Sequence, residues 1–210
     1  MARQLMLFER LNETAQPVVA EPRVTSAASN STPASLRPST FVALDFETAD
    51  AAHRYPIALG LVRVEHGAVV EEAYHLIHAP ARVFNAANTA VHGIPPSEVA
   101  QAAEFPEVLE AVRPLLHGVA FVAAHHAPFD RGVLAAACRR YNLRPPGHAW
   151  VCTRRLAKRT WSLRRGGLAH VAAHLGLVLN HHQALSDARA CAQIVLHASP
   201  HGEPLDGAHG

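Results

Sequence analysis

Two carboxylates, Asp45 and Glu47, stand at the end of an otherwise apolar segment of the sequence. The run from Phe41 to Glu47 is short and apolar, and it predicts a buried β-strand. Residues two apart on a strand point to the same face, so both acids would project together. Buried side by side they would repel each other and lose hydration, and a hard divalent cation removes both problems. The alternative is that the strand ends earlier and both acids lie in a solvated loop.

Two further acids, Asp130 and Asp187, fall on the apolar side of expected helices over residues 128–141 and 185–198. Each has apolar or aromatic residues at helical spacing further along the chain: Val133, Leu134, Ala137 and Tyr141 after the first, and Cys191, Ile194 and Ala198 after the second. Such a stripe marks the side of a helix that faces the core. Each acid also lies in the first turn, where capping or the helix dipole is an alternative explanation.

Four inward acids from three separate segments predict a site for a pair of Mg²⁺ or Mn²⁺ ions. Two such ions are a known arrangement for phosphodiester cleavage, in which a water attacks phosphorus and its proton must be accepted. His182 lies five residues before Asp187, in the loop that leads into the last expected helix, and is the candidate general base. His181 precedes it, and only the offset to Asp187 separates these two candidates.

Three motifs in order resemble those of the DEDDh 3′-to-5′ exonucleases, relatives of the proofreading epsilon subunit of bacterial DNA polymerase III. They are Phe41-Val42-Ala43-Leu44-Asp45-Phe46-Glu47-Thr48, Ala124-His125-His126-Ala127-Pro128-Phe129-Asp130 and His181-His182-Gln183-Ala184-Leu185-Ser186-Asp187-Ala188. The intervening His92-Gly93-Ile94 also resembles a loop of this family. The resemblance covers about residues 41–198.

The resemblance implies a ribonuclease H-like fold and stepwise release of nucleoside 5′-monophosphates from a 3′ end. It implies that the four acids bind metal and that His182 is the general base. Thr48, His92 and Ile94 would lie near the terminal nucleotide. The family's second motif usually carries Asn where this chain has His126, which affects local hydrogen bonding near Asp130. His125 is expected to order the loop around the site.

The sequence predicts one α/β domain, a mixed sheet with flanking helices, over residues 41–198. Residues 1–40 are expected to form a flexible tail or linker, because residues 14–40 are rich in Pro, Ser and Thr and lack periodicity. Residues 199–210, with two prolines and three glycines, are expected to form a loose tail. The remaining strands are expected over 57–64, 69–77, 119–124 and 150–152, and the remaining helices over 105–116 and 168–175.

Charge is distributed unevenly along the chain. No Asp or Glu occurs from Arg131 to Ser186, and this segment holds ten Arg and Lys residues. Such a segment favours binding of a polyanion, with a solvated basic surface as the alternative. Together with the acids, it predicts a nucleic acid as the substrate. The resemblance implies that this nucleic acid has a free 3′ end, with DNA preferred over RNA, in repair or proofreading beside a possible DNA polymerase or repair partner. An exoribonuclease and a non-catalytic nucleic-acid-binding module of the same fold remain the alternatives.

Composition excludes several classes of protein. At 49% hydrophobic residues the chain can bury a core, which a wholly disordered chain cannot. No run of eighteen apolar residues occurs and Met1-Ala2-Arg3-Gln4-Leu5 does not resemble a secretory signal, so no membrane association is expected. The odd number of cysteines, with no Cys-x-x-Cys pair, argues against a disulfide framework and favours the cytoplasm. His170 and His174 have the spacing of a zinc pair, but no third ligand is evident.

Overall fold

The computed structural model describes residues 39–200 and Leu205, and it forms a mixed α/β fold around one five-stranded sheet. The strands are β1 (Thr40–Thr48), β2 (Pro56–Glu65), β3 (Ala68–Leu76), β4 (Phe121–Ala124) and β5 (Ala149–Cys152). Their order in the sheet is β3-β2-β1-β4-β5. β1 pairs antiparallel with β2 and parallel with β4, so the predicted mixed sheet is confirmed.

The helices are α1 (Ala86–His92), α2 (Pro96–Val99), α3 (Phe105–Leu116), α4 (Ala127–Arg140), α5 (Thr153–Thr160), α6 (Leu168–Leu175) and α7 (Ala184–Ala198), with a 3₁₀ turn at Ala81–Val83. The sequence analysis missed α1, α2 and α5. Among the described residues, no helix combines the length and apolar character needed to cross a membrane.

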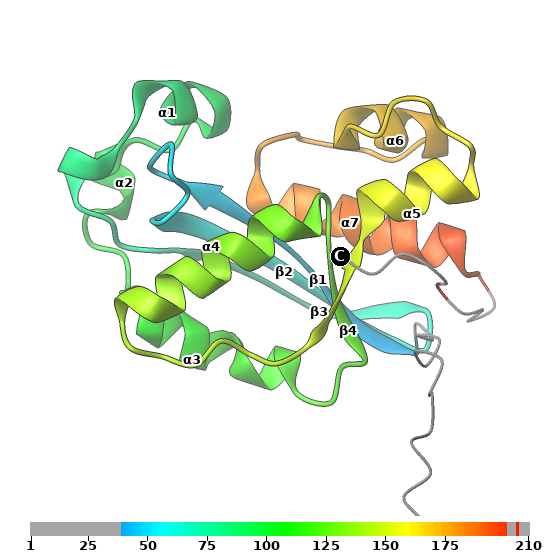
Figure 1. The fold of residues 1–210 in the computed structure, drawn as a ribbon, viewed down its shortest axis with the longest axis horizontal. Coiled ribbons are helices and arrows are strands. Elements are labelled where there is room, and N and C mark those ends of the chain that lie inside the picture. Colours follow the sequence, from blue (N-terminus) through cyan, green and yellow to red (C-terminus); the bar gives the residue numbers. More distant parts are fainter. Residues whose placement is uncertain (1–38, 201–204, 206–210) are drawn as a thin grey trace, which may run out of the picture. The chain divides into compact units, whose positions relative to one another are not determined.

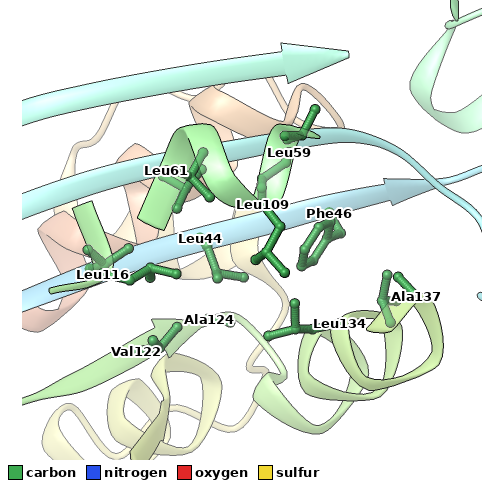
Figure 2. Close-up of a cluster of buried hydrophobic side chains, with 14 of the residues drawn as sticks. Leu44, Phe46, Leu59, Leu61, Leu109, Leu116, Val122, Ala124, Leu134 and Ala137 are labelled. Carbon is green, nitrogen blue, oxygen red and sulfur yellow. The ribbon is translucent and has the colours of Figure 1, made fainter. Parts of the chain in front are cut away.

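Strand β1 separates two apolar clusters because its side chains alternate between the faces of the sheet. Val42, Leu44 and Phe46 point toward α3 and α4, where they pack with residues such as Leu109 and Leu134 (Figure 2). Phe41 and Ala43 point to the opposite face, which α5, α6 and α7 cover. Figure 1 shows α3 and α4 in front of the sheet and α7 behind it. Asp45 and Glu47 continue the second series, so their side chains emerge on the α7 side.

The start of helix α7 lies directly against the sheet at Gly60 of β2, the residue paired with Asp45 of β1. A Cβ atom at Gly60 would lie 2.3 Å from the carbonyl carbon of Ala184 and 2.4 Å from the amide nitrogen of Leu185. Both are backbone atoms at the start of α7, which a side-chain rotation cannot move aside. Glycine at this position therefore allows α7, and Asp187 in its first turn, to lie against the end of β1.

The expected tails fall almost wholly outside the described residues. Thr40 already belongs to β1, and residues 1–38 are not described. Leu205, within the segment expected to be a loose tail, is 2% exposed and packs with the cluster on the α7 side of the sheet. Residues 201–204 and 206–210 are likewise not described.

The contact at Gly60 predicts opposite effects of the same substitution at two glycines. Gly60→Ala should lower the free energy of unfolding by about 1–3 kcal/mol, because overpacking against backbone forces α7 to shift. Gly132→Ala in α4, where an added Cβ meets nothing within 4 Å, is the matched control. It should raise stability by up to about 1 kcal/mol, since Ala is the better helix former. Urea unfolding of both variants measures this, and equal stabilities would contradict the close approach.

Candidate active site

The carboxylates of β1 meet the first turn of α7. Ligand oxygens of Asp45, Glu47 and Asp187 all lie within 4.8 Å of one another. Asp45 is partly exposed, whereas Glu47 and Asp187 are buried. The strand does not end before these acids, since β1 runs to Thr48. The solvated-loop alternative for Asp45 and Glu47 is therefore wrong.

Asp130 reaches the same place from the opposite face of the sheet. It lies in the first turn of α4 and is 1% exposed. Its Oδ1 accepts a hydrogen bond of 3.2 Å from the backbone N–H of Phe46, the residue between the two acids of β1. Its Oδ2 is buried without a hydrogen-bond partner. The side chain thus faces inward, as its stripe predicted, and keeps one oxygen free.

Asp187, like Asp130, has one carboxylate oxygen with hydrogen-bond partners and one without. Its Oδ2 accepts hydrogen bonds from His181 Nδ1 at 2.8 Å and from the backbone N–H of His182 at 3.2 Å. Its Oδ1 is buried without a partner. Helix α7 is capped instead by Gln183, whose side chain accepts from Ser186 N–H. Capping therefore does not explain Asp187.

These four acids repel one another in a poorly hydrated site. Burial raises the pKa of Glu47 to about 8, with Asp187 and Asp130 adding to the shift. Burial, opposed by hydrogen bonds from the backbone, raises the pKa of Asp130 to about 8. The pKa of Asp45 also lies well above its usual value, first through burial and then through its three acidic neighbours. Carboxylate oxygens left without partners are the ligands that hard divalent cations take. The donor set thus fits a divalent ion.

The loop before α7 brings two histidines to this cluster, and it is His181 whose ring contacts an acid. The imidazole rings of His181 and His182 stack with centroids 3.8 Å apart. His182 has a positive φ of 66°, and burial, reinforced by His181, lowers its pKa. It is therefore a neutral imidazole near pH 7, able to accept a proton. The sequence analysis did not predict the hydrogen bond from His181 to Asp187. His181 and His182 lie six and five residues before Asp187, and a loop can bring either ring to that acid.

A pocket of about 410 Å³ opens in front of the acids. Its far wall combines residues of the β1–β2 turn, α1 and α4: Thr48, His53, Asn88, Val91, His92 and Phe129. Thr48 Oγ1 is held by His53 Nδ1 at 3.1 Å and by Asn88 Nδ2 at 3.2 Å. His53 meets the ring of Phe129 edge-on, with centroids 4.7 Å apart. The sequence analysis named Thr48 but missed His53 and Asn88, which belong to no motif, and it gave Phe129 of the second motif no role.

The residues His92 and Ile94 have different positions relative to the pocket. His92 ends α1 and lines the pocket, and its Nε2 is buried without a hydrogen-bond partner. Ile94 does not line it. Its side chain is 8% exposed and packs in an apolar cluster beside Ile57 and Val99. The backbone N–H of Ile94 donates to His92 Nδ1 at 3.0 Å. Ile94 can therefore act on a ligand only by orienting His92.

His125 bridges two loops at the rim of the pocket, as expected for a residue that orders the loop. Its Nδ1 lies 2.9 Å from Thr153 Oγ1 and its Nε2 lies 2.7 Å from the carbonyl oxygen of Gly166. Burial lowers its pKa to about 4, so the ring is neutral. Because a carbonyl only accepts, Nε2 carries the proton and donates to Gly166.

His126 occupies the position where the family motif usually has Asn. It is exposed, lines the pocket and caps α4 in the left-handed conformation, with φ 74°. Asn and His both adopt this conformation more readily than most residues. The backbone requirement at this position is thus met by either residue type, and the imidazole is what differs.

The zinc interpretation of His170 and His174 gains no support. Across residues 39–200 and Leu205, the groups of three side chains close enough to hold a metal are His181–His182–Asp187 and Asp45–Glu47–Asp187. Neither group includes His170 or His174. Trp161 lies against His174, with ring centroids 6.0 Å apart.

Comparison with known proteins identifies relatives of this fold and site. Residues 42–195 match the family model RNase T, described as Exonuclease. The PolC-type DNA polymerase III of Thermotoga petrophila is 32% identical over 161 residues, which are 75% of this chain and 12% of that protein. Exodeoxyribonuclease 10 of Escherichia coli K12 is 30% identical over 148 residues, 67% of this chain and 60% of that protein. The chain thus spans less than two thirds of either relative.

Two solved structures share the fold. Exonuclease X in complex with 5′ overhanging duplex DNA superposes with a TM-score of 0.65 at 23% identity, covering 80% of this chain and 96% of that one. The nuclease domain of 3′hExo, a DEDDh family member bound to rAMP, gives a TM-score of 0.67 at 16% identity and covers 81% and 94%. These structures confirm the ribonuclease H-like fold. The match over residues 42–195 shows that the chain belongs to the RNase T exonuclease family.

Proposed function

We propose that this protein is a metal-dependent 3′-to-5′ exonuclease that removes nucleoside 5′-monophosphates from DNA. The observation that carries the proposal is the convergence of Asp45, Glu47 and Asp187 at one pocket. Asp130 is held next to them by its hydrogen bond from Phe46 N–H, and the buried oxygens Asp130 Oδ2 and Asp187 Oδ1 have no hydrogen-bond partner. Unpaired buried carboxylate oxygens are costly, and a ligand that compensates them stabilises the site. Family membership supplies the reaction class, phosphodiester hydrolysis.

The four acids would hold two Mg²⁺ or Mn²⁺ ions. When bound, such ions supply an activated water and neutralise charge on the departing oxygen. The oxygen of the water forms a bond to the terminal phosphorus as the bond to the 3′ oxygen of the preceding nucleotide breaks. His182 accepts the proton of the water, for which its neutral state suits it. His181 orients Asp187, and Thr48 and His92 contact the terminal nucleotide, with Ile94 behind His92.

DNA is favoured over RNA by the names of the relatives. Relatives that are at least 30% identical include a PolC-type DNA polymerase III and exodeoxyribonuclease 10, beside a putative bifunctional exonuclease/endonuclease of Mycobacterium tuberculosis whose name states no preference for a sugar. Structures with RNA or rAMP in their descriptions are 16% identical and inform only on the fold. The likeness to PolC-type polymerases supports proofreading or repair beside a DNA polymerase as the role. RNA ends are the second candidate substrate.

Removing one proposed metal ligand should abolish hydrolysis without unfolding the protein. Asp45→Asn and Asp187→Asn should each lower the rate on a 5′-labelled single-stranded DNA by about a thousandfold or more, since a charge that stabilises the transition state is lost. Matched DNA and RNA oligonucleotides, with Mg²⁺, Mn²⁺ or chelator, measure the rate and the preference for sugar. Glu110→Gln, an exposed acid of α3 that pairs with Arg113, is the control and should leave the rate unchanged. Cleavage by both Asn variants at the wild-type rate would refute the assignment.

The acid cluster also predicts how stability depends on pH and metal. The pKa values of Glu47 and Asp130 are raised to about 8 in the folded state, so the folded chain binds more protons than the unfolded chain from about pH 4 to 8. Without metal, the melting temperature should therefore fall as the pH rises through this window. Millimolar Mg²⁺ or Mn²⁺ should raise the melting temperature most at the alkaline end of this pH window, where the ions do not compete with protons for the carboxylates. Calorimetry with and without chelator tests this, and Asp45→Asn should flatten the dependence.

Single substitutions of His182 and His181 test whether the first accepts a proton and the second orients Asp187. His182→Asn, chosen because Asn tolerates the positive φ, should lower kcat by about a hundredfold or more. His181→Asn should instead weaken metal binding, seen as a higher Mg²⁺ concentration for half-maximal rate, because Asp187 loses its hydrogen bond. The reverse pattern would assign the base to His181.

A further inference from the structure

The pocket in front of the acids is too small to hold a length of nucleic acid. Its volume of about 410 Å³ lies at the low end of ligand sites. It can receive the end of a strand, and the rest of the strand must run over the surface. Binding of that part depends on contacts to phosphates, which carry most of the affinity for nucleic acids. The question is which surface beside the pocket carries the required positive charge.

Beside the pocket, behind His125, lies a group of unpaired cations, here called the basic track. It consists of α5 and the loop after it, and its cations are Arg154, Arg155, Lys158, Arg159, Arg164 and Arg165. All six are exposed. Arg54, Arg63, Arg113 and Arg189 each pair with a carboxylate, but within the described part of the chain no basic-track residue does. The positive charge of the track is therefore available to a ligand.

The basic track is fixed to the pocket through His125. Because His125 bonds both Thr153, the first residue of α5, and Gly166 in the following loop, it ties both ends of the track to the pocket rim. A Cβ at Gly166 would lie 3.0 Å from side-chain carbons of Arg154 and Lys158, so these two stems cover the loop. Figure 1 shows α5 beginning beside the N-terminal end of α4, where His125 and His126 line the pocket.

The opposite rim lacks comparable charge. Its lining residues on α1 are Asn88, Val91 and His92, and burial lowers the pKa of His92 below its ordinary value. Arg54 in the β1–β2 turn is neutralised by Asp50 at 3.2 Å. A polyanion that leaves the pocket is therefore attracted toward α5 and not toward α1.

We propose that the basic track binds the sugar–phosphate backbone of the nucleic acid that leads into the pocket, with Arg154 and Lys158 as its first contacts. The inference rests on the proposed function, since it assigns the path of that substrate. Arg154 and Lys158 are four residues apart on α5, so they lie on one face about 6 Å apart along the helix. Leu156 anchors the opposite face in the core, and the neighbouring Ala157 is buried beside it. The helix thus presents a row of charges on a rigid support.

The test compares a substrate that can reach the track with one that cannot. Arg154→Gln/Lys158→Gln is assayed on a single-stranded 20-mer and on thymidine 5′-monophosphate p-nitrophenyl ester, which fills the pocket alone. The ratio of kcat/KM for the 20-mer to that for the ester should fall about tenfold. The slope of log binding constant against log salt concentration, measured by anisotropy with the 20-mer, should become shallower by about 1.4, the value for two contacts to a single strand.

Arg139→Gln/Arg144→Gln is the matched control, because it removes the same charge from an exposed region near the C-terminal end of α4. This variant should keep the wild-type ratio and slope. Track and control variants with equal ratios and slopes would overturn the proposal. If the wild type hydrolyses neither substrate with Mg²⁺ or Mn²⁺, the proposed function fails, and the anisotropy measurement still decides whether the track binds the strand.

Discussion

Mutual repulsion among four carboxylates is the constraint on which this structure depends. Asp45, Glu47, Asp130 and Asp187 come from one strand and two helices, and burial raises the pKa of each of them. A fold governed only by stability would keep such groups apart. Both apolar clusters, the alternation along β1 and the close contact at Gly60 serve to hold them together. The site is costly for the protein alone and becomes favourable when positive charge is supplied.

A group of acids and a group of cations lie next to each other at one pocket. Asp45, Glu47 and Asp187 line the pocket, and the basic track lies beside it, tied to it by the neutral ring of His125. A neutral residue is suited to this place, because a charged one would bind either the acids or the ligand. Under the proposed function, this arrangement would separate the binding of a strand from the cleavage of its end.

Much of the fold and of the proposed site could be predicted from the sequence, because periodicity and burial determine both. The acids of β1 follow from a period of two, and Asp130 and Asp187 follow from helical stripes whose residues Val133, Cys191 and Ile194 are buried as expected. Helix α5 was missed because it has eight residues and only two of them, Leu156 and Ala157, are apolar. Two apolar residues do not make a recognisable helical stripe. Helix α1 does have a signal in the sequence, because Asn85 is a favoured N-cap residue and Gly93 is a favoured residue at a helix C-terminus. The sequence analysis did not use this signal.

The remaining features depend on distances that no local pattern encodes. The wall formed by His53, Asn88 and Phe129 joins three segments, and each residue alone resembles an ordinary loop or helix residue. The choice of His181 as the ring bonded to Asp187 depends on the path of the loop at His182, whose φ is positive. Tertiary contacts set these features.

The pairing of Asp45 with Gly60 disfavours any other register between β1 and β2. A slip of one residue would bring Leu59 or Leu61 beneath the start of α7, where even a methyl group collides with backbone. The same slip would exchange the two faces of β2, so Leu59 and Leu61 would leave the apolar cluster beneath α3 and α4. Chains with a shifted hairpin would therefore fail to close the last helix and would lack the fourth acid.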